Sequence, residues 1–306
     1  MQQAFQNWSN WMLTLGKSRA TQAGYSWEMR QLIRRIPDKG LDDYRADDLL
    51  AYLALRRATC GDAAIKRAVN ALRSFFAFCL KERSPAAELS APRPKKRLQR
   101  TLSLEQSFAV LAACDTSSPI GVRDVALMTL MLDSGIRAAE VCRLAIDKLD
   151  LGRRVFCMIV KGGHEASGIF GPETASFAAR WLAVREGLAA PGVSTVFVGI
   201  GGLTPGRPLT TDGLRRIFHR VGRAAGLAHF SPHDLRRTFA TTMTLLKAPS
   251  RLAQLWGRWG NLQEFERYTQ ALLEMQNMLR DEFDPYSPVR AALNIRGKMG
   301  SDRAPA

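Results

Sequence analysis

The stretch HDLRRTF, residues 233–239, places a histidine and an arginine where they could bind a phosphate. On a helix, His233 and Arg236 are three residues apart and therefore lie on one face. Ser231 and Pro232 are a typical helix start, so both side chains would lie near the first turn, where free N–H groups favour an anion. On its own, the stretch is explained better as a capped helix with a surface histidine.

The stretch DSGIRAAEVCRL, residues 133–144, contains another arginine beside a carboxylate. Gly135 is a natural helix stop, and Arg137 follows it just inside a new helix. Glu140 comes three residues later on the same face, where its carboxylate could orient the guanidinium group. A guanidinium can bind two phosphate oxygens at once, so this pair could form a second phosphate clamp. A structural ion pair at a helix start is an equally good interpretation.

Two further residues could supply a proton donor and a nucleophile. Lys161, in IVKGGHEASG, ends an expected strand before two glycines, at the tip of a hairpin from which it could donate a proton. Tyr268, in WGNLQEFERYTQ, lies on the last strong helical pattern. A phenolic oxygen can attack phosphorus if a base removes its proton and cations stabilise the developing charge. Taken singly, a turn lysine and a packed tyrosine are the simpler interpretations.

Together these residues form a complete set for phosphoryl transfer without a metal. The set comprises two arginines, a lysine, a histidine and a tyrosine. The sequence shows no acidic cluster of the D-x-D type that binds two magnesium ions, which argues against a metal-dependent nuclease. We therefore expect neither a metal nor a cofactor.

Composition indicates the partner. The 306 residues include 44 Lys and Arg against 28 Asp and Glu, a net charge of +16. An excess of this size favours a polyanion, usually nucleic acid, over the alternative of an ordinary basic enzyme. Five scattered cysteines without a CxxC pair fit thiols in a reducing cytoplasm, the expected location. No apolar run approaches the roughly 20 residues that span a bilayer, and no signal peptide is evident, so we expect no membrane partner.

The first part of the chain predicts a helical bundle. Apolar residues recur at helical spacing over 4–15, 18–36, 45–57 and 62–83, enough for a core of its own within residues 1–90. A basic, proline-containing linker is expected over 91–103. The candidate phosphate contacts are the cations that lie off the apolar stripe of the last helix or within the linker: Lys66, Arg67, Arg73, Arg93, Lys95, Lys96 and Arg97. A merely solvated hinge explains the linker cations about equally well.

The remainder predicts a second domain over 104–285 and a tail over 286–306. Ser103 and Gln106 form a capping box before its first helix. The β-branched and aromatic run 153–160 can pair with 167–171 as a hairpin. Helices are expected over 124–134, 173–187, 211–225, 231–246 and 261–283. The fold class is therefore mainly α with a small β-hairpin or sheet, that is, α+β.

The order Arg, Lys, His-x-x-Arg, Trp, Tyr resembles the tyrosine recombinase, or phage integrase, family. SGIRAAEVCRL resembles the family's first arginine box, and HDLRRTFAT resembles its H-x-L-R box almost letter for letter. Lys161 lies 24 residues after Arg137, at the start of a hairpin loop, where the family keeps its lysine. The resemblance makes Arg137, Arg236, His233, Lys161 and Tyr268 catalytic residues, with Glu140 as the acid that supports Arg137.

The box before the tyrosine departs from the family pattern. Most members have Gly-His there, whereas this chain has GRWGN. Trp259 precedes Tyr268 by nine residues, the spacing that the family shows, so the resemblance makes Trp259 catalytic; aligning Arg258 instead would break the spacing by one. The lysine loop also lacks a second basic residue common in the family. Tyr286 is a rival nucleophile, but it lies between Pro285 and Pro288, off any helix that would hold it rigidly.

The resemblance implies a site-specific DNA recombinase or integrase. It implies a helical core-binding domain and a catalytic domain in a C-shaped clamp on double-stranded DNA with a specific recombination site. Cleavage and rejoining would pass through a 3′-phosphotyrosyl bond, in a homo-oligomer that is a tetramer in synapsis, with the tail exchanged between protomers. A type IB topoisomerase, a hairpin-forming resolvase and a non-catalytic repressor derived from an integrase stay open as alternatives.

Overall fold

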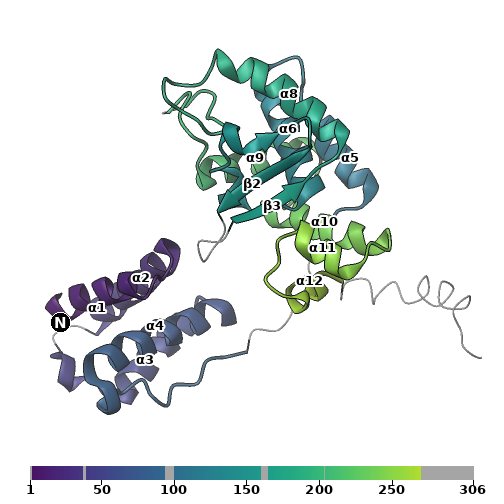
Figure 1. Cartoon of the computed structure of the whole chain (residues 1–306). Helices are drawn as coiled ribbons and strands as arrows, with labels where there is room; N and C mark the ends of the chain where they lie inside the picture. The colour runs from purple at the N-terminus through teal and green to yellow at the C-terminus, as the bar shows by residue number, and fades with distance from the viewer. Residues whose placement is uncertain (1, 37–38, 94–99, 160–164, 203, 270–306) are drawn as a thin grey trace, which may run out of the picture. The chain divides into compact units, whose positions relative to one another are not determined.

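The computed structural model describes residues 2–36, 39–93, 100–159, 165–202 and 204–269 (Figure 1). The chain divides into two compact units, Met1–Arg97 and Leu98–Ala306, called here the N-terminal and C-terminal units. Within the described residues, no helix is both long and apolar enough to cross a membrane. The structure is mainly helical with one small sheet, which confirms the expected fold class.

The N-terminal unit is built from helices packed around α4. Its elements are α1 (Gln2–Thr14), α2 (Arg19–Arg35), α3 (Ala46–Arg57) and α4 (Asp62–Leu80), with short 3-10 turns at Leu41–Asp43 and Lys81–Arg83. Helix α4 contacts each of the other three helices. Trp8 of α1 meets Phe75 of α4 edge to face at 5.3 Å, and both rings are fully buried. Aromatic packing of this kind gives the unit a core of its own.

A buried carboxylate connects three helices of this unit. Glu28 of α2 is fully buried and accepts a hydrogen bond from the Tyr52 hydroxyl at 2.8 Å. The guanidinium of Arg56 donates to it at 3.2 Å, and Nε of Arg67 lies 3.4 Å away. Charged groups of this type must be paired when they are removed from water. Arg67, one of the expected DNA contacts, is therefore already engaged within the fold.

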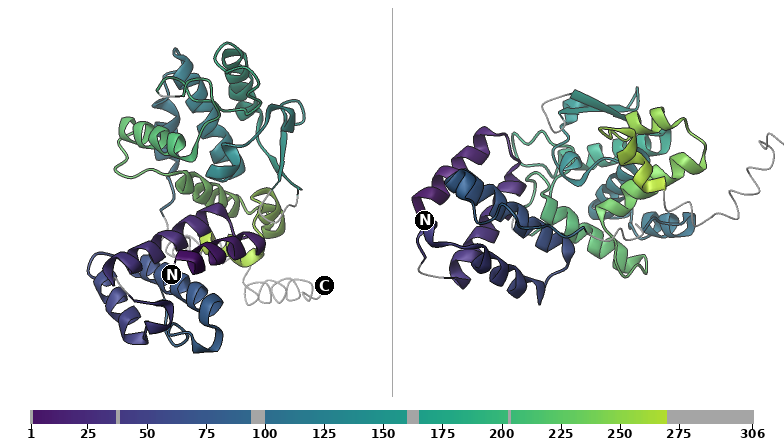
Figure 2. Two further views of the ribbon diagram at one scale, coloured as in Figure 1. Left: turned by 90° about the vertical axis from the view of Figure 1, so that its left-hand side faces the viewer. Right: turned by 90° about the horizontal axis from the view of Figure 1, so that it is seen from below.

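The C-terminal unit surrounds one almost completely buried helix, α6 (Pro119–Ser134). Helix α6 packs against α8 (Pro172–Glu186) and α10 (Pro232–Leu245). The views in Figure 2 place the sheet at the edge of the helices of this unit. The other helices are α5 (Leu104–Ala112), α7 (Ala138–Val141), α9 (Thr211–Ala224), α11 (Ser250–Trp256) and α12 (Leu262–Thr269).

The sheet contains the expected hairpin and one additional strand. Strands β2 (Val155–Ile159) and β3 (Glu165–Ile169) are antiparallel, with Phe156 opposite Gly168. Strand β1 (Leu149–Asp150) pairs with the other edge of β2. A strand of two residues shows no alternation along the sequence, which explains why β1 was not expected.

The element boundaries agree with expectation at one point and differ from it at two. The Ser103–Gln106 capping box at the start of α5 is confirmed. The segment expected to be an exposed linker is packed at its end, since Leu102 is buried and its N–H donates to the Thr238 hydroxyl at 2.9 Å. Helix α11 was not expected, because seven residues are too few for a clear helical period. Of the long helix expected over 261–283, only α12 lies within the described residues.

Helix α6 ends at Gly135, as the sequence predicts. Gly135 adopts a left-handed backbone with φ 59°, and its N–H donates to the Met131 carbonyl at 3.1 Å. A Cβ atom at this position would lie 2.6 Å from the Phe239 ring of α10. The turn therefore needs glycine for two reasons, its backbone conformation and the close approach of a buried ring.

We expect Gly135→Ala to lower the free energy of unfolding by about 2–4 kcal/mol, because a left-handed alanine costs about 1 kcal/mol and overpacking adds about 1–3. Gly192 is the matched control, since its φ is 75° but nothing lies within 4 Å of its Cβ position. Gly192→Ala should cost only about 1 kcal/mol. Urea unfolding of the two full-length variants measures the difference; equal losses would contradict the close contact with Phe239.

Candidate active site

The short segment between α6 and α7 carries the first expected pair. Arg137 is the N-cap of α7, and its N–H donates to Glu140 Oε2 at 3.0 Å. Its guanidinium donates to Glu140 Oε1 at 2.9 Å. The Glu140 side chain is 7% exposed, whereas that of Arg137 is 38% exposed. The carboxylate thus orients a guanidinium that still reaches solvent, as a phosphate ligand must.

The charge of Glu140 is maintained by its neighbours. Burial alone would raise the pKa of this carboxyl group. The N–H of Arg137 and the positive charges of Arg258 and Arg137 outweigh that effect and bring the pKa below its ordinary value. Glu140 is therefore ionised at neutral pH, and it can hold a guanidinium by charge as well as by hydrogen bonding.

Arg236 reaches the same segment from α10. Its guanidinium donates to the carbonyl of Gly135, the residue that ends α6. The centre of the guanidinium lies 4.4 Å from the centroid of the Trp259 ring, a cation–π contact. Arg137 and Arg236 are 99 positions apart in the sequence. Arg137 nevertheless follows the last residue of α6 by three positions, and Arg236 donates to the carbonyl of Gly135 at the same helix end.

Trp259 lies beside Arg236 as a buried support. Its ring stacks with Phe239 at 6.0 Å and contacts Phe265 of α12 at 5.2 Å. A Cβ atom on Gly257 would overlap the same ring, so that glycine makes room for it. The indole nitrogen is buried. The structure therefore gives Trp259 a packing contact with Arg236.

His233 is the second residue of α10, and its side chain is exposed. Loss of water around the ring, followed by the positive charges of Arg237 and Arg236, lowers its pKa below the ordinary 6.5. A neutral imidazole at pH 7 can accept a proton. The histidine stands on the same helix as Arg236, three residues before it, as the sequence predicts.

The tyrosine and the lysine are placed only in part. The backbone of Tyr268 lies in α12, which is attached to this region through Phe265 on Trp259. Lys161 follows the end of β2 by two residues and lies outside the described residues, as does Tyr286. Among the residues that are described, no group of three His, Cys, Asp or Glu side chains could hold a metal ion.

Arg258 is a buried cation of this site that the sequence interpretation set aside. Its Nη2 lies 3.6 Å from Glu140 Oε2, and its carbonyl accepts a hydrogen bond from Arg137 at 3.2 Å. The alignment of the tryptophan box gave it no role. Its departure from the family's Gly-His pattern was the one available signal.

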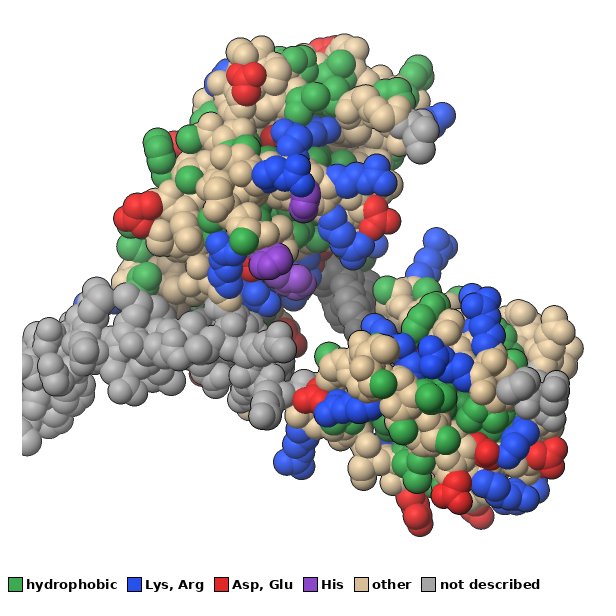
Figure 3. Space-filling model, turned by 180° about the vertical axis from the view of Figure 1, so that it is seen from behind, with side chains coloured by type: hydrophobic (Ala, Val, Ile, Leu, Met, Phe, Trp, Pro, Cys, Tyr) green, Lys and Arg blue, Asp and Glu red, His purple; other side chains and the backbone are tan. Residues whose placement is uncertain are grey.

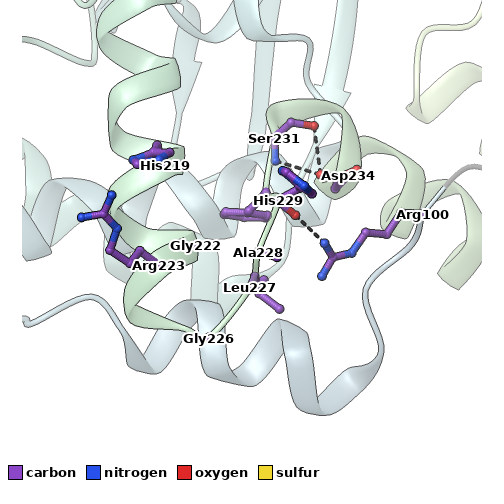
Figure 4. A pocket seen from close by; sticks show the side chains of 11 residues that line it. Arg100, His219, Gly222, Arg223, Gly226, Leu227, Ala228, His229, Ser231 and Asp234 are labelled. Atoms are coloured by element: carbon purple, nitrogen blue, oxygen red, sulfur yellow. Dashed lines mark hydrogen bonds between the residues drawn. The ribbon is translucent and has the colours of Figure 1, made fainter.

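A basic groove lies beside the start of α10. It has a volume of about 820 Å³, and its lining includes Arg100 and Arg223, the histidines His219 and His229, and the carboxylate of Asp234 (Figure 4). The guanidinium of Arg100 donates to the His229 carbonyl. Figure 3 shows Lys and Arg side chains gathered around histidines on the C-terminal unit. These residues were missed, although exposed Arg216, His219, Arg220 and Arg223 follow a helical spacing that could have indicated the face.

Comparison with known proteins agrees with this geometry. Residues 100–275 match the phage integrase family. Tyrosine recombinase XerC of Corynebacterium efficiens is 32% identical over 275 residues, 86% of each chain. Tyrosine recombinase XerD of Lacticaseibacillus casei is 28% identical, over 78% of this chain and 83% of the relative.

Two solved structures share the fold. XerH site-specific recombinase bound to a palindromic difH substrate has a TM-score of 0.69 and 19% identity, over 87% of this chain and 80% of that one. A lambda integrase(75-356) dimer bound to a COC′ core site has a TM-score of 0.68 and 17% identity, over 88% and 94%.

The family match over residues 100–275 identifies a DNA strand transferase of the tyrosine type. The chain belongs to the phage integrase family. It is a tyrosine-type site-specific recombinase, as its XerC and XerD relatives are.

The position of His233 generates a prediction. Arg237→Gln should raise the His233 pKa toward 6.5, because it removes the positive charge that repels the protonated ring most strongly while leaving the ring in place. NMR titration of the imidazole, assigned with His233→Gln, measures the midpoint. His233 has a lower pKa in the folded protein than in the unfolded chain, so the unfolded chain binds more protons below pH 6.5. Protonation of His233 therefore reduces the free energy of unfolding as the pH falls. An unchanged midpoint in Arg237→Gln would exclude repulsion by Arg237 as a cause.

Proposed function

We propose that Tyr268 is the nucleophile and that Arg137 and Arg236 bind the scissile phosphate. The observation that carries this assignment is the convergence of both arginines and the Trp259 box on the segment that ends α6. The Tyr268 oxygen attacks phosphorus, the bond to the 5′-oxygen breaks, and a 3′-phosphotyrosyl bond forms. The guanidinium groups neutralise the charge that develops on the non-bridging oxygens.

The remaining roles follow the chemistry of each group. Lys161 protonates the leaving 5′-oxygen. His233, kept neutral by its surroundings, accepts the tyrosine proton. Trp259 supports Arg236 by packing, and Glu140 orients Arg137. The covalent bond conserves the energy of the broken phosphodiester, so a second 5′-hydroxyl can attack and rejoin the strand without ATP. No metal or cofactor takes part in this scheme.

The proposed substrate is double-stranded DNA with a specific recombination site. The net charge of +16 and the groove lined by Arg100, His219, Arg223 and His229 support a polyanion. The XerH and lambda integrase structures named above were solved with their sites bound, which supports the same class of ligand.

The two units receive different proposed roles. Residues 1–90 form a core-binding domain, 91–103 connect it, and 104–285 form the catalytic domain. Lys66, Arg73 and Arg93 are exposed and available for phosphates. Arg67 would have to exchange its contact with Glu28. Lys95, Lys96 and Arg97 lie outside the described residues, and we keep them as proposed contacts.

We propose a tetramer in synapsis, joined by exchange of residues 286–306 between protomers. Exposed apolar side chains near the α10–α11 turn support a docking surface for this tail: Leu245, Leu246, Leu252 and Leu255. The segment 284–295 carries a short apolar face that could cover them. We also propose a cytoplasmic location, in keeping with the five free cysteines.

The nucleophile is tested by covalent trapping. Nicked suicide duplexes, carrying DNA that flanks the gene or a site obtained by binding selection, are incubated with full-length protein and chelator. A protein–DNA adduct should form with wild type and with Tyr286→Phe, and it should be absent with Tyr268→Phe, which lacks the attacking oxygen. Denaturing gels measure it. An adduct that survives Tyr268→Phe would refute the assignment; tight binding without any adduct would indicate a non-catalytic DNA-binding protein.

The contacts of the N-terminal unit are tested by salt dependence. The triple variant Lys66→Ala/Arg73→Ala/Arg93→Ala should bind the selected site more weakly and reduce the slope of log K against log salt by about 2–3, since each phosphate contact contributes about 0.9. Arg153→Ala, which removes an exposed cation from the C-terminal unit, is the control. If the triple variant keeps both affinity and slope, these residues do not contact DNA.

A further inference from the structure

Arg258 combines two properties that rarely occur together. Its backbone is left-handed, with φ 54°, a conformation that favours glycine and strains a long side chain. Its side chain is nevertheless buried, with 3% of its surface exposed. A strained, buried cation persists only where the surrounding structure supplies enough contacts to hold it.

Those contacts come from several separate elements. Its guanidinium donates to the carbonyl of Trp256 at the end of α11, at 3.0 Å. It also donates to the carbonyl of Ser134 at the end of α6, at 3.4 Å, and it lies 3.6 Å from the Glu140 carboxylate. Its centre is 4.9 Å from the centroid of the Phe156 ring on β2. One planar group therefore joins α11, α6, α7 and the sheet, which a point charge such as lysine could not do equally well.

The hairpin is shaped to accept this side chain. Gly168 lies opposite Phe156 on β3. A Cβ atom at Gly168 would be 2.3 Å from Arg258 Nη1 and 2.1 Å from the Phe156 ring. Any other residue at position 168 would displace the guanidinium or the ring below it. The space at Gly168 is thus part of the binding site for Arg258.

Arg258 acts on Arg137 in two ways. Its carbonyl accepts from Arg137 Nη2 at 3.2 Å. Its guanidinium shares the carboxylate of Glu140, which binds Arg137 Nη1 at 2.9 Å. Both groups that orient Arg137 in the described structure are therefore either part of Arg258 or in contact with it. Burial lowers the pKa of Arg258 to about 10, so the group is still charged at neutral pH.

We infer that Arg258 is a positioning residue for strand cleavage: it fixes the segment that leads from α11 through Trp259 to α12 against the end of α6, and it holds Glu140 and its own carbonyl where they orient Arg137. The inference rests on the proposed role of Arg137 as a phosphate ligand. The described partners of the Arg258 guanidinium are the carbonyls of Trp256 and Ser134 and the carboxylate of Glu140, so we expect its loss to change the geometry of the reaction and not DNA binding.

Arg258→Gly isolates the side chain. Glycine adopts φ 54° without strain, and it keeps the backbone carbonyl that accepts the hydrogen bond from Arg137. The substitution therefore removes the side chain of Arg258 with its guanidinium and leaves the backbone contact in place. The first-order rate of adduct formation on the nicked duplex should fall about 10- to 100-fold, the size expected from a small misplacement of reacting groups. The Kd for the same duplex should be unchanged. Arg154→Gly is the matched control, because Arg154 is exposed and has φ 56°; it should cleave at the wild-type rate.

Coupling to Glu140 separates this role from general destabilisation. Glu140→Gln should also slow cleavage, and the loss in the double variant Arg258→Gly/Glu140→Gln should be smaller than the product of the two single losses, since the two residues share one contact. Fully multiplicative losses, or a wild-type rate in Arg258→Gly, would overturn the inference. If thermal melting shows that Arg258→Gly is poorly folded, Arg258→Lys decides. It should be several-fold slower at an unchanged melting temperature, and an unchanged rate would overturn the inference. An absence of adduct with wild type would instead refute the proposed function itself.

Discussion

The site depends on the unsatisfied carbonyl groups at the end of α6. A helix leaves its last carbonyls without intrahelical partners and concentrates partial negative charge there. In this protein those positions are occupied by guanidinium groups, with Arg258 on Ser134 and Arg236 on Gly135. Since α6 is the most deeply buried helix of its unit, its end is held firmly in place, and so are the guanidinium groups bonded to it. Arg137 follows two residues later, so the helix end sets the spacing of the whole cation cluster.

Bringing several guanidinium groups together requires compensation for their mutual repulsion. One carboxylate, Glu140, lies between Arg137 and Arg258. Two aromatic faces supply further stabilisation, Trp259 for Arg236 and Phe156 for Arg258. Glu140 balances one charge only, so the cluster keeps a net positive charge. An unbalanced positive site with preset geometry is what the developing charge of a pentavalent phosphate requires.

Local chemistry explains what the sequence could predict. The Arg137–Glu140 pair, the Gly135 stop and the capped start of α10 depend on residues within a turn of one another, and all are present in the structure. Arg258 depends instead on partners near positions 134, 140, 156 and 168, which no local pattern brings together. The groove is lined by one continuous stretch, 219–234, and only Arg100 reaches it from a distant part of the chain. Elements too short to show a period, β1 and α11, were missed for a different reason. The roles of Lys161 and Tyr268 rest on the resemblance, and the trapping experiment tests that of Tyr268.

The close approach of Gly168 to Arg258 limits how this sequence can diverge. Any side chain at position 168 would occupy the volume that the guanidinium and the Phe156 ring already fill. A larger residue could therefore be accepted there only after both the side chain at position 258 and the ring at position 156 had changed. Reversal would then be closed, since an arginine returning to position 258 would meet an occupied site. Two positions 90 residues apart in the sequence thus constrain each other's size.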